Sequence, residues 1–184
     1  MAANQALILW RPEFLPTSVL IAAAPRNFPH AHDFDKFDLA TAQANRAGPD
    51  GRHILLGNSH QLWLPTAGLG EPLAALIPFD DDFPLRIAGL LRFWQHLTGQ
   101  NVSPLPRSMR LTSQRRDRLI LMLRALDARL AGATYREIAT DLFGADAVAE
   151  PGWKTLPVRA RTIRLVQDAI AMMEGGYFDL LRGH

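Results

Sequence analysis

The chain has 184 residues, enough for one large domain or two small ones, and 48% of them are hydrophobic, which is sufficient for a packed core. It contains no cysteine, which excludes disulfides, thiolate zinc sites and cysteine nucleophiles. Residues 101–184 hold 13 Lys and Arg against 9 Asp and Glu, whereas residues 1–100 hold 7 against 9, so the C-terminal part is the basic one. The chain has no apolar run of membrane-spanning length and does not open on a secretion signal, which predicts a cytoplasmic protein.

Short apolar runs separated by turn residues predict a small β-rich domain in the first hundred residues. Strands are expected at 6–10, 18–24 and 73–77, the last between Pro72 and Pro78. Residues 52–56 and 60–64, around the Gly-Asn-Ser at 57–59, predict a β-hairpin. Residues 38–46 predict one or two helical turns, and the Gly-Pro-Asp-Gly at 48–51 predicts a turn.

Two clusters of polar residues have the chemistry of metal ligands. His30, His32, Asp33 and Asp35 resemble part of a hydrolase site, but no further motif completes the ligand spacing, so surface-loop histidines are the favoured interpretation. Mg²⁺ would accept the carboxylates of residues 80–82, but adjacent side chains converge poorly. Capping of the following helix, at the positive end of its dipole, is favoured for these acids. No metal and no other cofactor is therefore expected.

An apolar helix is predicted at 83–97, followed by a linker at 101–106. The linker sequence, NVSPLP, is typical of a domain boundary. The predicted domains are a β-rich domain at 1–100 and a helical DNA-binding domain at 107–184. This helix has more large apolar side chains than one narrow face can hold: Leu85, Leu90, Leu91, Phe93, Trp94 and Leu97. A helix that is apolar over most of its surface is buried on more than one side, which predicts that the helix at 83–97 bridges the two domains. The predicted fold class is therefore α+β.

Three helices are predicted in the C-terminal domain, at 114–131, 134–143 and 158–173. The first has an apolar stripe at three- and four-residue steps, made by Leu119, Met122, Leu123, Leu126 and Leu130. Thr112 or Ser113 can cap it, Gly132 follows its end, and Thr134 with Glu137 predicts a capping box for the second helix. This order, with a tight turn between the first two helices, predicts a helix-turn-helix. The second turn, 144–156, is longer than usual, and 145–149 predicts an extra half-turn.

The third helix is the candidate for contact with DNA. Ile163, Val166, Ile170 and Met173 share one face, flanked by Thr162 and Ala169. Arg161, Arg164, Gln167 and Asp168 lie opposite, with Arg159 near the boundary. A basic face on the last helix suits docking in the major groove, where Arg contacts either guanine edges or phosphates. The predicted DNA-binding residues are Lys154, Thr155, Arg159, Arg161, Arg164 and Gln167, with Lys154, Thr155 and Arg159 near the phosphates. The alternative is a solvated face on a plain helical bundle.

Long stretches of the sequence resemble a known family. They are RRDRLILMLRALDARLAGATYREIATDLFG from Arg115, WKTLPVRARTIRLVQDAIAMMEGGYFDLL from Trp153, and, nearer the N-terminus, WRPEFLP, GRHILLG, LWLP, PLAALIPFDDD and LRFWQHLTG. The chain resembles the proteobacterial domain-of-unknown-function family found in regulators of integrative and conjugative elements and of type VI secretion. The resemblance implies a helix-turn-helix DNA-binding domain that controls transcription. It implies no enzyme activity.

The same resemblance leaves two kinds of regulator open. Some members of the family activate excision and transfer genes, and others are antiactivators that bind an activator. Many longer members begin with a further small domain bearing a Trp-Glu-Phe-Leu-Arg-Arg-like motif, which this sequence lacks, so the resemblance does not imply autonomous activation.

Double-stranded DNA is accordingly the first expected partner, and another regulator or a second copy of the chain is the alternative. A DNA-binding regulator is weighed against a protein-interaction module. The basic face of the third helix favours the first function, and an exposed apolar patch near Trp153 or the tail would favour the second. A hydrolase using His30 and His32 is the weakest hypothesis, because no nucleophile elbow, recognisable pair of catalytic acids or cofactor fingerprint accompanies it.

Overall fold

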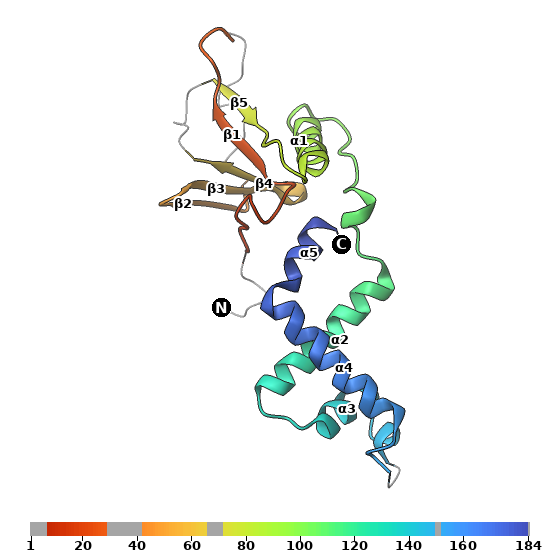
Figure 1. Ribbon diagram of the computed structural model, residues 1–184. Coiled ribbons are helices and arrows are strands. Elements are labelled where there is room, and N and C mark those ends of the chain that lie inside the picture. The colour runs from red at the N-terminus through yellow and green to blue at the C-terminus, as the bar shows by residue number, and fades with distance from the viewer. Residues whose placement is uncertain (1–6, 29–41, 66–71, 150–151, 184) are drawn as a thin grey trace. The chain divides into compact units, whose positions relative to one another are not determined.

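The computed structural model describes residues 7–28, 42–65, 72–149 and 152–183 (Figure 1). The predicted α+β class is confirmed, because a five-stranded sheet in the N-terminal part is followed by a helical C-terminal region. Two compact units divide the chain: the first is Met1–Met109 with Leu181–His184, and the second is Arg110–Leu180. Within the described ranges, every helix is too short or too polar to cross a lipid bilayer.

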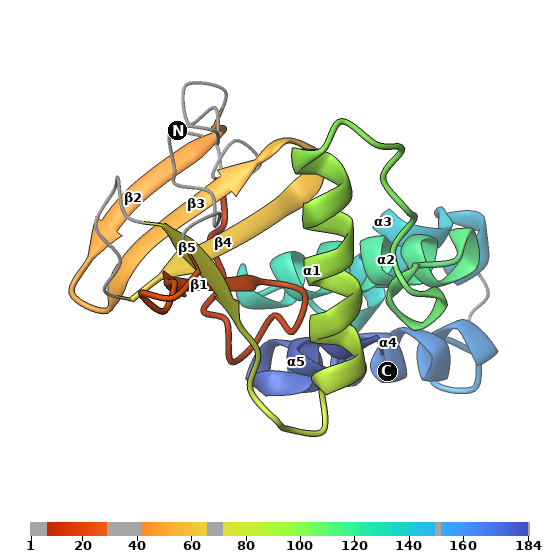
Figure 2. The same cartoon turned by 90° about the horizontal axis from the view of Figure 1, so that it is seen from above.

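The first unit is built on a mixed sheet with the strand order β2-β3-β4-β1-β5 (Figure 2). The strands are β1 (Val19–Ala23), β2 (Ala44–Gly48), β3 (Gly51–Leu56), β4 (His60–Leu64) and β5 (Leu73–Leu76). Strand β1 pairs in parallel with β4, and the other three pairs are antiparallel. The predictions of strands at 18–24 and 73–77 and of the β3–β4 hairpin are confirmed.

Helix α1 (Phe83–Leu97) covers this sheet, and its bounds agree with the predicted ones. Phe93 is buried among Val19, Ile21, Ile54, Leu56, Leu62 and Leu64. Gly89 is buried as well, and a Cβ there would lie 2.6 Å from the Thr17 carbonyl oxygen. This close approach fixes the face of α1 that meets the sheet, and it leaves Leu91 and Trp94 about half exposed.

Two predictions near the N-terminus fail where they can be checked. Residues 7–10 form no strand, because the side-chain amide of Gln61 takes both backbone groups of Trp10: Oε1 accepts from the Trp10 N–H at 2.8 Å, and Nε2 donates to its carbonyl. The chain at 44–46 belongs to β2 rather than to a helical turn. The rest of that predicted turn up to residue 41, like His30, His32, Asp33 and Asp35, lies outside the described residues.

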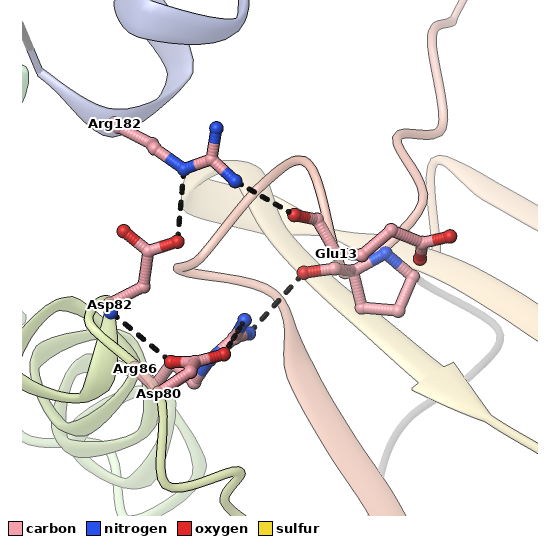
Figure 3. A network of polar contacts seen from close by, with 6 residues as sticks. Glu13, Asp80, Asp82, Arg86 and Arg182 are labelled. Carbon is pink, nitrogen blue, oxygen red and sulfur yellow. Dashed lines mark hydrogen bonds and ion pairs between the residues drawn. The ribbon is translucent and has the colours of Figure 1, made fainter.

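Two of the acidic residues before α1, Asp80 and Asp82, pair with arginines (Figure 3). Asp80 binds Arg86 at 2.7 Å, and this guanidinium holds the pKa of Asp80 below its usual range. Asp82 stands at the N-cap of α1, but its side chain accepts from Arg182 Nε at 3.0 Å rather than from the helix. The expected side-chain capping is therefore wrong for Asp82.

Backbone carbonyls near the start of the chain complete the same network. Arg86 donates to the carbonyl of Pro12 at 3.3 Å, and Arg182 donates to that of Glu13 at 3.4 Å. Arg86 is only 7% exposed, so these partners compensate for its burial. Arg182, near the end of the chain, is thereby attached to the first unit.

The second unit consists of helices α2 (Ser113–Leu130), α3 (Tyr135–Phe143) and α4 (Pro157–Ala171). A single turn of 3-10 helix, Asp146–Val148, lies in the long connection between α3 and α4 and confirms the predicted half-turn. A π-helical turn, Met172–Gly176, follows α4 and leads into the short α5 (Tyr177–Arg182). The core of this unit is formed by Met122, Ala125, Leu126, Ile138, Leu165, Val166 and Ala169.

Substitution of Gly89 by alanine should destabilise the first unit. Alanine favours a helix by about 1 kcal/mol over glycine. The new Cβ would instead meet backbone atoms of Thr17, which cannot move aside as a side chain can. We expect a net loss of roughly 1–2 kcal/mol in urea unfolding. Leu91→Ala, at a half-exposed position of the same helix, is the control and should change stability less; a Gly89→Ala protein as stable as the wild type would contradict the close approach.

His60 makes the stability of the first unit depend on pH. Its ring is 5% exposed and lies 5.1 Å from that of His96. Its Nε2 atom makes no hydrogen bond within the part of the chain that the structure describes. Burial, helped by the positive charges of His96 and Arg92, lowers the pKa of His60 to about 4.

The His60 ring binds a proton more readily in the unfolded chain than in the folded chain, because folding lowers its pKa. The free energy of unfolding should therefore fall as the pH drops from about 6.5 to about 4. The slope should approach about 1.4 kcal/mol per pH unit within this window. His60→Gln should flatten the fall in urea titrations at several pH values. An unchanged slope in a variant that is folded at pH 7 would show that His60 is not the responsible group.

Candidate nucleic-acid interface

Helices α2, α3 and α4 pack on one another, and the contact between α2 and α4 is the most extensive of the three (Figure 1). Ala125 on α2 and Val166 on α4 are fully buried. Thr162 is fully buried as well, and its hydroxyl donates to the Val158 carbonyl within α4 at 2.8 Å. The small side chains at 125 and 162 allow the two helices to approach closely, which fixes the rotation of α4 about its axis.

Local signals in the sequence place α3 against this pair. The Thr112 hydroxyl caps α2 by accepting from the Arg115 N–H, and Gly132 has a φ of +90° in the turn that follows α2. The predicted capping box is confirmed: Glu137 N donates to the Thr134 hydroxyl at 3.3 Å, and Thr134 N donates to the Glu137 carboxylate at 2.7 Å. The N–H and hydroxyl of Thr134 hold the pKa of Glu137 below its usual range.

The buried face of α4 is shifted from the predicted one toward Thr162 and Ala169, which were expected at its flank. Its centre lies at Thr162, Leu165, Val166 and Ala169, whereas Ile163 and Ile170 are half-buried and Met173 is 47% exposed. On α2, likewise, Leu123 and Leu130 of the predicted stripe are exposed, and Ala125 is in the core. The apolar positions of both helices were recognisable, but the partner helix decides which of them are covered.

Arg161, Arg164 and Gln167 are all exposed on α4. The guanidinium of Arg161 lies 4.5 Å from the centre of the Phe143 ring, at the end of α3, which orients it by a cation–π contact. Arg164 makes no hydrogen bond or ion pair with any residue in the described ranges. The two arginines are thus presented on the side of α4 next to its buried face.

The remaining predicted residues lie at or before the start of α4. Arg159 is half-buried in the first turn, and Lys154 is exposed in the turn before the helix. In that turn, both the N–H and the hydroxyl of Thr155 donate to the Gly152 carbonyl at 2.8 Å. Thr155 therefore has no free donor for a phosphate while this turn is intact.

A cleft of about 760 Å³ brings Arg161 and Arg164 together with arginines of α2. Arg115 and Arg118 come from the first half of α2, one helical turn apart, and the sequence prediction missed both. The residues that line the cleft are Thr112, Gln114, Arg115, Asp117, Arg118, Leu121, Arg161, Arg164 and Leu165. A spacing of three residues does place Arg115 and Arg118 on one side of α2, but the sequence gives no sign that this side faces α4.

One carboxylate of α4 compensates part of this positive charge. Arg118 pairs with Asp168 at 2.5 Å, and both side chains are about half exposed. On the other side of α2, Arg124 pairs with Asp141 of α3 at 2.9 Å. Four arginines and Asp117 line the cleft, so its walls carry more positive than negative charge. Across the described residues, no group of three or more His, Asp or Glu side chains is placed to hold a metal ion.

Residues 76–182, more than half of the chain, match a protein-family model described as "T6SS, Transcription factor, DNA binding domain". The class of protein is therefore a transcription factor with a DNA-binding domain. The chain belongs to this family of T6SS transcription factors, and the prediction of a DNA-binding regulator is confirmed at that level. The matched span begins in β5 and includes α1, so it also contains both partners of the Asp82–Arg182 ion pair. No curated protein matches the chain.

Loss of the α3 cap should loosen the helix that carries Phe143 beneath Arg161. Thr134→Ala removes the acceptor for the Glu137 N–H and should lower the stability of the second unit by about 1 kcal/mol. Thr134→Ser keeps the hydroxyl and is the matched control. Urea unfolding followed by far-ultraviolet circular dichroism would measure both. Equal stability of the Ala and Ser variants would contradict a stabilising cap.

Proposed function

We propose that the chain regulates transcription by binding double-stranded DNA with the first half of α4. Arg161, Arg164 and Gln167 would face the duplex, and Arg159, Lys154 and Thr155 would lie near its phosphates, where Thr155 would hold the turn before α4 rather than donate to a phosphate. The observation that carries the proposal is the division of α4 into one face buried against α2 and another that presents exposed arginines. A helix docked in the major groove needs such a face. This arrangement supports the helix-turn-helix interpretation.

The charge around α4 favours DNA over a neutral or acidic partner. Arg161 and Arg164 share one cleft with two further arginines, and guanidinium groups bind phosphate through two parallel hydrogen bonds. The family description supports the same partner. Its reference to T6SS points to type VI secretion genes as the regulated genes, and the sequence resemblance adds genes of integrative and conjugative elements.

The proposal predicts that Arg161→Ala with Arg164→Ala weakens DNA binding without unfolding the protein, because both side chains are exposed. Loss of a base contact should cost roughly 1–3 kcal/mol and relax the preference at one base pair. Loss of a phosphate contact should weaken all duplexes alike and reduce the salt dependence. Fluorescence anisotropy with duplexes tiled across the gene's own upstream region, at two or more salt concentrations, would separate the two.

Arg116→Ala with Arg124→Ala is the charge-matched control. Both residues are exposed on α2, and neither lines the cleft. DNA affinity and salt dependence that survive the α4 substitutions, or that fall as far in the control, would show that α4 does not read DNA.

A second function is favoured by one separate observation. An apolar groove of about 340 Å³ lies on the second unit, where Leu123 and Met173 are 60% and 47% exposed. It is lined by Leu119, Met122, Leu123, Leu126, Ala169, Met172, Met173, Tyr177 and Leu180. An exposed apolar surface suits binding to another regulator, as an antiactivator or co-regulator does, or to a second copy of the chain. A wild-type protein that binds no DNA but binds a purified regulator tightly would favour this function.

A further inference from the structure

One wall of the four-arginine cleft is formed by α2, and the proposed recognition of DNA by α4 does not use it. Arg115 and Arg118 lie on α2, more than forty residues before Arg161 and Arg164 in the sequence, yet all four share the cleft. Asp117 is the one carboxylate among the lining residues, so the lining has an excess of positive charge. Like charges gathered in this way repel one another, and an anion bound among them relieves the repulsion.

The chemistry of the cleft selects a phosphate group. Each guanidinium is permanently charged and planar, and it matches the oxygens of a phosphate bidentately. The Thr112 oxygen already accepts from Arg115 N, so its hydroxyl hydrogen is free to donate to an anion. The start of α2, at Thr112 and Gln114, adds the positive end of an 18-residue helix dipole.

The exposure of the walls favours the phosphate of a polymer. Gln114, Arg161 and Arg164 are exposed, and the Arg118 side chain is 59% exposed, so the cleft lies open at the surface. A nucleic-acid backbone can lie along such a cleft, whereas a small metabolite is usually enclosed by its site. Backbone contacts of this kind position a protein on the duplex without reading its sequence.

The ion pair between Arg118 and Asp168 adds a second feature. An exposed pair contributes little to stability, so Arg118 can leave Asp168 for a phosphate at small cost. Until then, Asp168 keeps the Arg118 guanidinium beside α4 and close to the cleft. Asp168 would therefore compete with a bound phosphate for Arg118.

We infer that the cleft between α2 and α4 binds a phosphate of the DNA backbone, with Arg115 and Arg118 of α2 as sequence-independent contacts beside α4. The inference rests on the proposed function, because it takes DNA as the ligand. It assigns to α2 the task of positioning the duplex for α4.

The test is the salt dependence of binding by the full chain to two duplexes of unrelated sequence. Arg115→Ala and Arg118→Ala should each weaken both duplexes by the same factor, roughly 3–10-fold, and reduce the slope of log K against log salt by about 0.9. Arg116→Ala removes the same charge from the neighbouring position, outside the cleft, and should leave the slope unchanged. Slopes that stay at the wild-type value in both cleft variants, or that fall equally in Arg116→Ala, would overturn the inference that the cleft binds a backbone phosphate.

Asp168→Asn gives a test in the opposite direction. The substitution releases Arg118, so the variant should bind both duplexes more tightly than the wild-type protein does. Asp127→Asn, on an exposed position of α2 outside the cleft, makes the same change of charge and should have a smaller effect. Equal gains in the two variants would show a general effect of net charge and would count against the ion-pair competition.

The outcomes separate this inference from the proposed function. A wild-type protein that binds neither duplex overturns both. Binding that depends on Arg161 and Arg164 but not on Arg115 and Arg118 overturns phosphate binding by the cleft. It leaves the proposed recognition of DNA by α4 intact. Inorganic pyrophosphate supplies the same chemistry from a free anion. If it bound more tightly than the duplexes, and in an Arg118-dependent manner, DNA would be the wrong source of the phosphate.

Discussion

The packing of α4 against α2 is the contact on which the candidate DNA-binding surface depends. Ala125, Thr162 and Val166 have no exposed surface, and interiors this closely packed respond to the change of even a single methylene group. Once this face of α4 is buried, its arginines can only project beside it, toward Arg115 and Arg118. A change at this helix–helix contact would therefore disperse the positive charge without altering any arginine.

Much of the fold could be predicted because its signals are local. The bounds of α1, the β3–β4 hairpin and the capping box of Thr134 with Glu137 all follow from residues close together in the chain. The failures have distant causes. Trp10 is held by the side chain of Gln61, fifty-one residues away, so an apolar run that favours a strand has no ladder to join. Asp82 binds Arg182 one hundred residues away instead of capping its own helix.

The candidate site could be predicted only in part for the same reason. Arg161, Arg164 and Gln167 were found because the helical period alone separates them from the apolar face. Arg115 and Arg118 join them through the packing of two helices, which no spacing within α2 reveals. The family match also extends upstream to residue 76, so the DNA-binding domain in the family sense includes α1 as well as the helices of the second unit. The Asp82–Arg182 pair links the two ends of that span.

The most direct measurement is a nuclear magnetic resonance titration of the isotopically labelled full chain, which at 20.4 kDa is within reach of the method, with a DNA duplex. Binding by α4 and the cleft predicts the largest shifts at the backbone amides of 157–167 and 112–118 and at the side-chain Nε–Hε groups of Arg115, Arg118, Arg161 and Arg164. Shifts confined to the first unit, or to the apolar groove around Leu123 and Met173, with the resonances of α4 unchanged, would contradict DNA binding by α4 and the cleft.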